Sequence, residues 1–161
     1  MGLGISTRDC DERLLKINRV TITSAQLKAL VATPKTLIDA PGPGKVIVVL
    51  DAWIHNPAAS DPTYTTQYTE STANPVIEYS GGTDISAAIE STAGAVVSAT
   101  ESVQRVTFAN TATAVYTLVV NQAVQLLQPS ADFAAGTNPI FVYITYRILD
   151  LKEGASVFKE L

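Results

Sequence analysis

The segment from Lys45 to His55 limits the possible folds more than any other part of the sequence, because it is long, apolar and rich in β-branched residues. It follows the turn signal Ala40-Pro41-Gly42-Pro43-Gly44, in which proline removes backbone donors and glycine permits positive φ. We predict a hairpin turn there between two strands. Strand alternation gives the segment two faces, which carry Val46, Val48, Leu50, Ala52 and Ile54 on one side and Ile47, Val49, Asp51, Trp53 and His55 on the other.

The first half of this segment is apolar on both faces, which is typical of a strand inside a two-layer β structure or against a neighbouring subunit. A second segment, Ile140 to Leu149, has the same character. Its two faces carry Ile140, Val142, Ile144, Tyr146 and Ile148 on one side and Phe141, Tyr143, Thr145, Arg147 and Leu149 on the other. We therefore predict that these two segments are the central elements of the fold.

Shorter strands are indicated by alternation and by flanking turn residues. The predicted segments are Ile17 to Ile22, Tyr64 to Thr69, Val76 to Tyr79, Ala95 to Ala99, Val103 to Phe108, Val115 to Val120 and Val124 to Leu127. Asp84 to Ile89 fits either a short helical turn or a ragged strand.

One short helix, Ser24 to Ala32, is indicated near the N-terminus, because Thr23 and Gln26 have capping-box spacing and Pro34 ends the pattern. Helix is otherwise scarce, turns recur between short strands, and no repeat is visible. The fold class is therefore all-β, as a sandwich, a jelly roll or a small barrel.

At 161 residues the chain is most simply one domain with an ordinary hydrophobic core. Both terminal segments lack a clear strand or helix period. We therefore divide the chain into an N-terminal arm at 1–16, a β-sandwich domain at 17–150 and a C-terminal tail at 151–161.

The composition restricts the classes of partner. Only 16% of residues are charged and 47% are hydrophobic, with a mean hydropathy of +0.21, so we expect the chain to bury surface in an assembly. A net charge of -4 without a Lys/Arg cluster argues against nucleic acid as a partner.

The single cysteine, Cys10, fits synthesis in a reducing cytosol. The charged N-terminus and interrupted apolar runs predict neither a signal peptide nor a membrane span.

The Gly44-Lys45 pair invites comparison with a phosphate-binding loop, but the spacing of that motif is absent. Its first glycine would fall at Asp39 and its magnesium-binding hydroxyl at Val46, and a strand follows where a helix N-terminus is needed. We interpret the segment as a turn and predict no cofactor.

No catalytic constellation is predicted. His55 is the only histidine, which excludes His-rich metal sites, and Asp51 lies too far along the same extended strand for a direct bond to it. The sequence contains no Gly-x-Ser-x-Gly nucleophile elbow. His55 is interpreted as an exposed or hydrogen-bonded residue at a strand end.

Other reactive side chains also receive a structural interpretation. A glycosidase needs a pair of carboxylates, which the sequence could supply only if the fold brings together two of Glu70, Glu78 and Glu90. Cys10 lies between two aspartates, whose negative charge disfavours a reactive thiolate. The six tyrosines have no interleaved Arg or Lys, and we interpret them as strand residues or protein-contact anchors; they are Tyr64, Tyr68, Tyr79, Tyr116, Tyr143 and Tyr146.

Several short motifs follow one another between Val20 and Leu149. They are Ile22-Thr23-Ser24-Ala25-Gln26-Leu27-Lys28-Ala29-Leu30, Ala32-Thr33-Pro34, the turn Ala40 to Lys45 with its valine strand, Tyr79-Ser80-Gly81-Gly82, and Ile144-Thr145-Tyr146-Arg147-Ile148. In this order they resemble the head decoration or cement proteins of tailed bacteriophages, a family of small virion structural proteins.

The resemblance implies a jelly-roll-like β-sandwich or barrel that forms oligomers, often homotrimers, on the capsid exterior and bridges neighbouring capsomers. The implied partners are the major capsid protein and copies of the same chain, and the implied location is the virion after synthesis in the host cytoplasm. It implies no catalytic, cofactor-binding or metal-binding residues.

The arm and the tail lie outside the matching stretch and have no core of their own, so we infer that they contact the capsid or a neighbouring copy. The candidate interface residues are Arg8, Asp11, Arg13, Leu14, Leu15, Val157 and Phe158. Two other interpretations stay open: a head-fibre base, tail or adhesin component, and a carbohydrate-binding or hydrolytic β domain.

Overall fold

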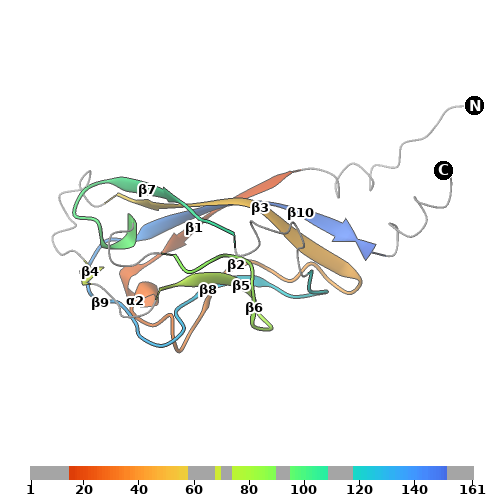
Figure 1. The fold of residues 1–161 in the computed structure, drawn as a ribbon, viewed down its shortest axis with the longest axis horizontal. Coiled ribbons are helices and arrows are strands. Elements are labelled where there is room, and N and C mark those ends of the chain that lie inside the picture. The colour runs from red at the N-terminus through yellow and green to blue at the C-terminus, as the bar shows by residue number, and fades with distance from the viewer. Residues whose placement is uncertain (1–14, 58–67, 70–73, 90–94, 109–117, 152–161) are drawn as a thin grey trace, which may run out of the picture.

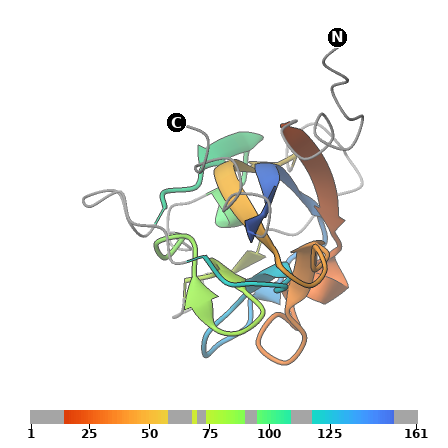
Figure 2. The same ribbon diagram turned by 90° about the vertical axis from the view of Figure 1, so that its right-hand side faces the viewer.

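The computed structural model describes residues 15–57, 68–69, 74–89, 95–108 and 118–151, most of which belong to two four-stranded antiparallel sheets. Sheet A has the order β1 (Lys16–Ile22), β10 (Ile140–Asp150), β3 (Lys45–Asn56), β7 (Ser102–Arg105). Sheet B has the order β2 (Lys35–Ile38), β8 (Val124–Leu127), β5 (Val76–Tyr79), β6 (Thr83–Asp84). The sheets lie face to face as two layers (Figures 1 and 2). A short pair joins β4 (Tyr68–Thr69) to β9 (Ala134–Ala135).

The strand order is that of a jelly roll. Among the eight strands of the two large sheets, only β5 and β6 are consecutive neighbours in one sheet, and every other connection crosses between the layers. Because successive strands change from one layer to the other, the two sheets pack together and each buries one of its faces against the other. The all-β prediction is confirmed, and of the three architectures left open the jelly-roll sandwich is the one present.

Strands β3 and β10 form the longest pairing among the described residues and lie at the centre of sheet A. The register joins Phe141 to His55 at one end of the pair and Asp150 to Lys45 at the other. The prediction that these two segments are the central elements is confirmed.

A β-bulge at Leu50 interrupts this pairing. Tyr146 pairs with Val49 and the next residue of β10, Thr145, pairs with Asp51, so that Leu50 has no direct partner on β10. A bulge inserts one residue into one strand, and each inserted residue exchanges the two faces of that strand.

The bulge explains why β3 looks apolar on both faces. Before it the β3 residues that belong to the core between the sheets are Ile47 and Val49, and after it they are Ala52 and Ile54. The predicted alternation, with one fixed set of residues on each face, is therefore wrong. Asp51, Trp53 and His55 lie on the opposite face of β3 from Ala52 and Ile54, which is the outer face of the sandwich.

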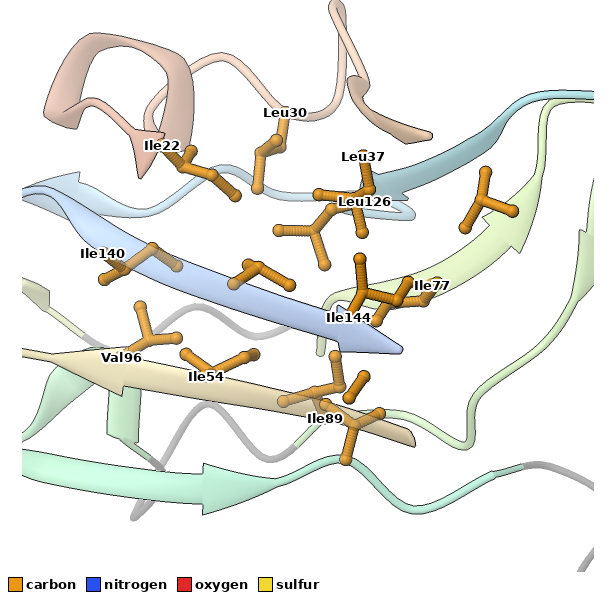
Figure 3. Packing of buried hydrophobic residues seen from close by; sticks show 14 of the residues in the cluster. Ile22, Leu30, Leu37, Ile54, Ile77, Ile89, Val96, Leu126, Ile140 and Ile144 are labelled. Carbon is orange, nitrogen blue, oxygen red and sulfur yellow. The ribbon is translucent and has the colours of Figure 1, made fainter. Parts of the chain in front are cut away.

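The core consists mainly of branched aliphatic side chains that both layers contribute, together with a few aromatic rings (Figure 3). Sheet A supplies Ile54, Ile140 and Ile144, which lie opposite Leu37, Leu126 and Ile77 of sheet B. One polar bond crosses the core, because the hydroxyl of Tyr79 on β5 donates to the backbone carbonyl of Ile47 on β3. The buried phenol thus satisfies its donor by joining the two layers.

The predicted helix from Ser24 to Ala32 is present only as its first turn, α2 (Ser24–Leu27). The capping box is confirmed, with the Thr23 hydroxyl accepting from the Gln26 amide N–H and the Gln26 side chain accepting from the Thr23 N–H. The α-helical ladder stops after Lys28, since the Ala29 N–H donates to the Gln26 carbonyl three residues back, and beyond it the Asp132 carboxylate accepts from the Val31 N–H at 2.7 Å.

The segment Ala95 to Ala99, predicted as a strand, begins with a 3₁₀ turn, η1 (Ala95–Val97), and the strand prediction is wrong. The buried Asn56 amide nitrogen donates to the carbonyls of Ala95, Val96 and Ser98 at 2.7, 3.1 and 3.2 Å. Carbonyls that all point to one donor cannot alternate in direction as those of a strand do.

The segment Ala40 to Gly44 turns the chain as predicted, but the hairpin interpretation is wrong. Strand β2 before it belongs to sheet B and β3 after it to sheet A, so the turn is a corner between the layers. Gly42 and Gly44 have φ values of 100° and 79°, which only glycine adopts readily.

The remaining strand predictions have mixed outcomes. Strands β1, β2, β5 and β8 lie where strands were predicted, whereas β7 ends at Arg105 and Phe108 forms only an isolated bridge with Ser86. Of the segment Asp84 to Ile89, only Asp84 belongs to a strand, as the last residue of β6.

Residues 64–67 and 115–117 lie outside the described part of the chain; Tyr68 and Thr69 form β4, and Val120 forms a single bridge with Val46. The division into arm, domain and tail stays a prediction. No helix among the described residues is long and apolar enough to cross a membrane.

We predict that Ile144→Ala lowers the free energy of unfolding by about 2–5 kcal/mol, because Ile144 is fully buried between the sheets and its loss leaves a cavity. The matched control is Ile17→Ala on the neighbouring strand β1, where the side chain is 71% exposed and the expected loss is below about 1 kcal/mol. Urea denaturation measures both. Equal losses at the two positions would contradict the assignment of the core face.

Candidate protein-protein interface

The outer face of sheet A carries the most unusual surface of the described residues. Strand alternation places side chains from all four strands on it, with their partners fixed by the register. From β1 to β7 these are Ile17, Arg19 and Thr21; Phe141, Tyr143, Thr145, Arg147 and Leu149; Val46, Val48 and Leu50 up to the bulge and Asp51, Trp53 and His55 after it; and Val103 and Arg105. Aromatic and apolar residues thus alternate with arginines where a soluble sheet usually carries small polar side chains.

One row crosses the whole sheet, and we call it the aromatic-arginine row. Arg19 pairs with Tyr143, Tyr143 with Trp53, and Trp53 with Arg105. An arginine therefore stands at each end of the row and two aromatic rings lie between them. Sequence reasoning missed this row, because the four residues come from four strands that are far apart in the chain.

Asp51 holds the Trp53 end of the row in place. Its carboxylate accepts from the Trp53 indole N–H at 2.8 Å and from Arg105 Nε at 2.9 Å. Arg105 also lies over the Trp53 ring, with its guanidinium carbon 5.9 Å from the ring centre. The indole and the guanidinium are therefore fixed relative to each other by one carboxylate.

These contacts lower the pKa of Asp51. Partial burial raises the pKa, but the hydrogen bonds from Arg105 and Trp53, the positive charge of Arg105 and the Ala52 backbone N–H together outweigh it. The carboxylate thus stays charged at neutral pH and keeps both of its partners.

The other end of the row is organised by stacking. The guanidinium carbon of Arg19 lies 4.0 Å from the centre of the Phe141 ring and 5.9 Å from that of Tyr143. Phe141 in turn contacts the His55 ring at a centroid distance of 5.7 Å. Within the described part of the chain Arg19 forms no ion pair, and the contacts of its guanidinium there are with aromatic faces.

A second group on the same face, which we call the aliphatic patch, consists of Leu15, Ile17, Leu50 and Leu149. All four are exposed, by 54%, 71%, 41% and 41% respectively. They lie toward the end of sheet A where β1 begins and β10 ends, since Lys16 pairs with Tyr146 and Asp150 with Lys45. Exposed apolar groups of this kind mark contact surfaces more often than scattered single residues do.

Of the predicted interface residues, only Leu15 lies within the described residues, and it belongs to the aliphatic patch. The others, Arg8, Asp11, Arg13, Leu14, Val157 and Phe158, lie outside the described part of the chain and stay predictions.

The side chains considered for chemistry make other contacts. His55 Nε2 lies 3.0 Å from the Glu101 carboxylate, and the Glu78 carboxylate accepts from the Gln125 amide at 2.8 Å. Cys10, Glu70 and Glu90 lie outside the described residues. Over the ranges that the structure describes, no three His, Cys, Asp or Glu residues gather where they could hold a metal ion.

The tyrosines are partly as expected. Tyr79 is a buried strand residue, and the hydroxyl of Tyr68 donates to the Asn138 carbonyl. Tyr143 differs, because the strand register places Arg19 beside it and Trp53 on its other side. All four members of the row fall on outward positions of their strands, but the phase of β3 depends on the bulge, and only the register shows that the four are neighbours.

No protein-family model matches the sequence, and no curated protein matches it significantly. Among solved structures, a chain of the cyanophage Pam1 capsid asymmetric unit is similar, with a TM-score of 0.44 and 16% sequence identity over 83% of this chain and 83% of that chain. At this TM-score the similarity supports no argument about function.

We predict that Asp51 contributes to stability in a pH-dependent way. Its folded pKa is depressed, so the contribution is complete above its ordinary pKa of 3.8 and is lost as the pH falls through the lower folded value. The difference in free energy of unfolding between the wild type and Asp51→Asn should therefore shrink on acidification from about pH 6 to about pH 3.

Urea denaturation followed by the fluorescence of Trp53, the single tryptophan, measures this difference. Asp84→Asn on sheet B is the control for the general loss of one negative charge. A difference for Asp51→Asn that does not change with pH would show that its carboxylate does not hold the row.

Proposed function

We propose that this chain is a structural, non-enzymatic virion protein that decorates a bacteriophage head and stabilises it by binding as an oligomer across capsomer junctions. The observation that carries the proposal is the aliphatic patch, which leaves large apolar side chains exposed on an otherwise well-packed jelly roll. Such a patch gains free energy when a partner covers it, at about 25 cal/mol per Å² of apolar area removed from water.

The placement of the patch supports an assembly role. It lies at the end of sheet A where the chain enters β1 and leaves β10, so residues before Lys16 and after Asp150 start beside it. Patch and terminal segments can therefore contribute to one continuous contact. The low charged fraction of 16% agrees with a protein that buries surface between subunits.

The proposed partners are the major capsid protein and copies of the same chain, and the proposed location is the capsid exterior. The order of the sequence motifs supports this choice, since it resembles that of head decoration proteins, and so does the jelly-roll fold that the resemblance implies. A virion protein of this kind needs no catalytic residues, no cofactor and no contact with nucleic acid or membrane.

We predict that Ile17→Glu weakens binding to purified heads of the encoding phage by about tenfold or more, because it places a charge in a contact that must be desolvated. The matched control is Val31→Glu, an exposed apolar residue after α2 that lies outside sheet A, which should bind as the wild type does. Co-sedimentation of labelled protein with heads measures both. Equal binding of the two variants would contradict the role of the patch.

We further predict that light scattering gives a mass of three times the 17.0 kDa chain, and that Ile17→Glu or Leu149→Glu lowers it. A monomer in solution and on the particle would contradict the oligomeric part of the proposal. A cryo-EM map with the density on the tail or at a fibre base would replace head decoration by the tail, fibre-base or adhesin alternative.

A further inference from the structure

We propose that the aromatic-arginine row is a recognition site for an acidic protein segment, one that presents two carboxylates on either side of an apolar side chain. The carboxylates would bind Arg19 and Arg105, and the apolar side chain would lie on Tyr143 and Trp53. The inference goes beyond the capsid role, because it assigns the chemistry of the partner and uses residues outside the aliphatic patch.

The Arg105 guanidinium is exposed and held in position for such a contact. It meets Asp51 through Nε, one of its five donors, and its side chain is 64% exposed. The carboxylate and the Trp53 ring hold the guanidinium in position, so little side-chain entropy is lost when a second carboxylate binds. Arginine and tryptophan are both among the residues enriched at the energetic hot spots of protein interfaces.

Arg19 differs from Arg105, because an aromatic ring holds its guanidinium where a carboxylate holds that of Arg105. It stacks on Phe141, and none of the carboxylates among the described residues pairs with it or competes for its in-plane donors. Stacking holds the planar group while leaving its edge available for bidentate contact with a carboxylate.

The stacked arginines also argue against a sugar as the occupant. Carbohydrates bind flat β faces by placing their rings on exposed aromatic rings, and at the Arg19 end of this face the guanidinium carbon lies 4.0 Å above the Phe141 ring. The accessible groups are therefore guanidinium edges and the strip between them, which suit carboxylates and one apolar group.

The charge distribution favours an acidic partner. Three of the five arginines of the chain, Arg19, Arg105 and Arg147, lie on the outer face of sheet A, where the strands place the Asp51 carboxylate and where the Glu101 carboxylate meets His55. The whole chain carries a net charge of -4. A basic face on an acidic protein attracts and orients negatively charged surfaces.

The register sets the spacing that a partner must match. Arg19 and Arg105 lie on the two edge strands of sheet A, three inter-strand steps apart, which is roughly 14 Å. An extended peptide advances about 3.3 Å per residue and shows every second side chain on one side. Two acidic residues four positions apart, with an apolar residue midway, therefore fit a peptide that crosses the strands.

The test titrates the full-length protein with a short end-blocked peptide of serine and glycine that carries two glutamates four positions apart and a leucine midway. Trp53 is the single tryptophan, so its fluorescence reports on the site itself. We expect a saturable change that disappears when glutamines replace the glutamates. Arg19→Gln and Arg105→Gln should each raise the dissociation constant by about tenfold.

Arg147→Gln is the matched control, since Arg147 lies on the same face outside the row, and its dissociation constant should stay within about twofold of the wild type. The proposal is wrong if the glutamate peptide gives no saturable change up to about 5 mM, or if the glutamine peptide binds equally well. It is also wrong if only neutral oligosaccharides change the fluorescence, which would identify a carbohydrate platform. A mass in light scattering that falls in Arg19→Gln would show instead that a second copy occupies the row.

Discussion

The pairing of β3 with β10, with one residue inserted at Leu50, determines most of what this molecule shows to its surroundings. If the pairing ran without the bulge, the residues after Leu50 would exchange faces, and Asp51, Trp53 and His55 would point into the core. A buried aspartate and histidine without partners would cost several kcal/mol, whereas the bulge itself only bends and twists the strand. The surface chemistry of sheet A thus depends on one extra residue.

The two groups on the outer face of sheet A have different physical roles. The aliphatic patch offers non-directional burial, which supplies affinity and tolerates small changes of orientation. The aromatic-arginine row offers fixed rings and directed hydrogen-bond donors, which bind a partner well in one orientation only. A partner without matching groups leaves a buried charge unpaired and binds more weakly. A surface with both groups can hold a partner tightly at one end and define its orientation at the other.

The sequence predicts the fold class and the central strands well, because the two apolar segments and the recurring turns depend on local patterns. Three predictions were wrong where the local structure includes contacts with distant residues: Asp132 accepts from the Val31 N–H beyond the helix end at Leu27, Asn56 donates to the carbonyls of the 3₁₀ turn Ala95 to Val97, and the pairing with β10 leaves a bulge at Leu50. Each of these contacts joins residues that are far apart in the chain, so no local window contains the information.

The residues of the candidate site were harder to predict from the sequence than the fold. Leu15 was identified as an interface residue from its terminal position, yet Arg19, Tyr143, Trp53 and Arg105 were not, because they become neighbours only through the register of four strands. Alternation correctly indicates that a residue points outward once its strand phase is known. It does not indicate which outward residues share a row, and a binding surface on a sheet is defined by its rows.

The positions of Lys16 and Asp150 at the same end of sheet A have a mechanical consequence. A force that pulled the two ends of the described chain apart would open the edge strand β1 from β10 one pair at a time, beginning at Lys16 and Tyr146, and would not shear all their hydrogen bonds together. Unzipping in this direction offers little resistance, and forced unfolding is governed by the rate of such opening.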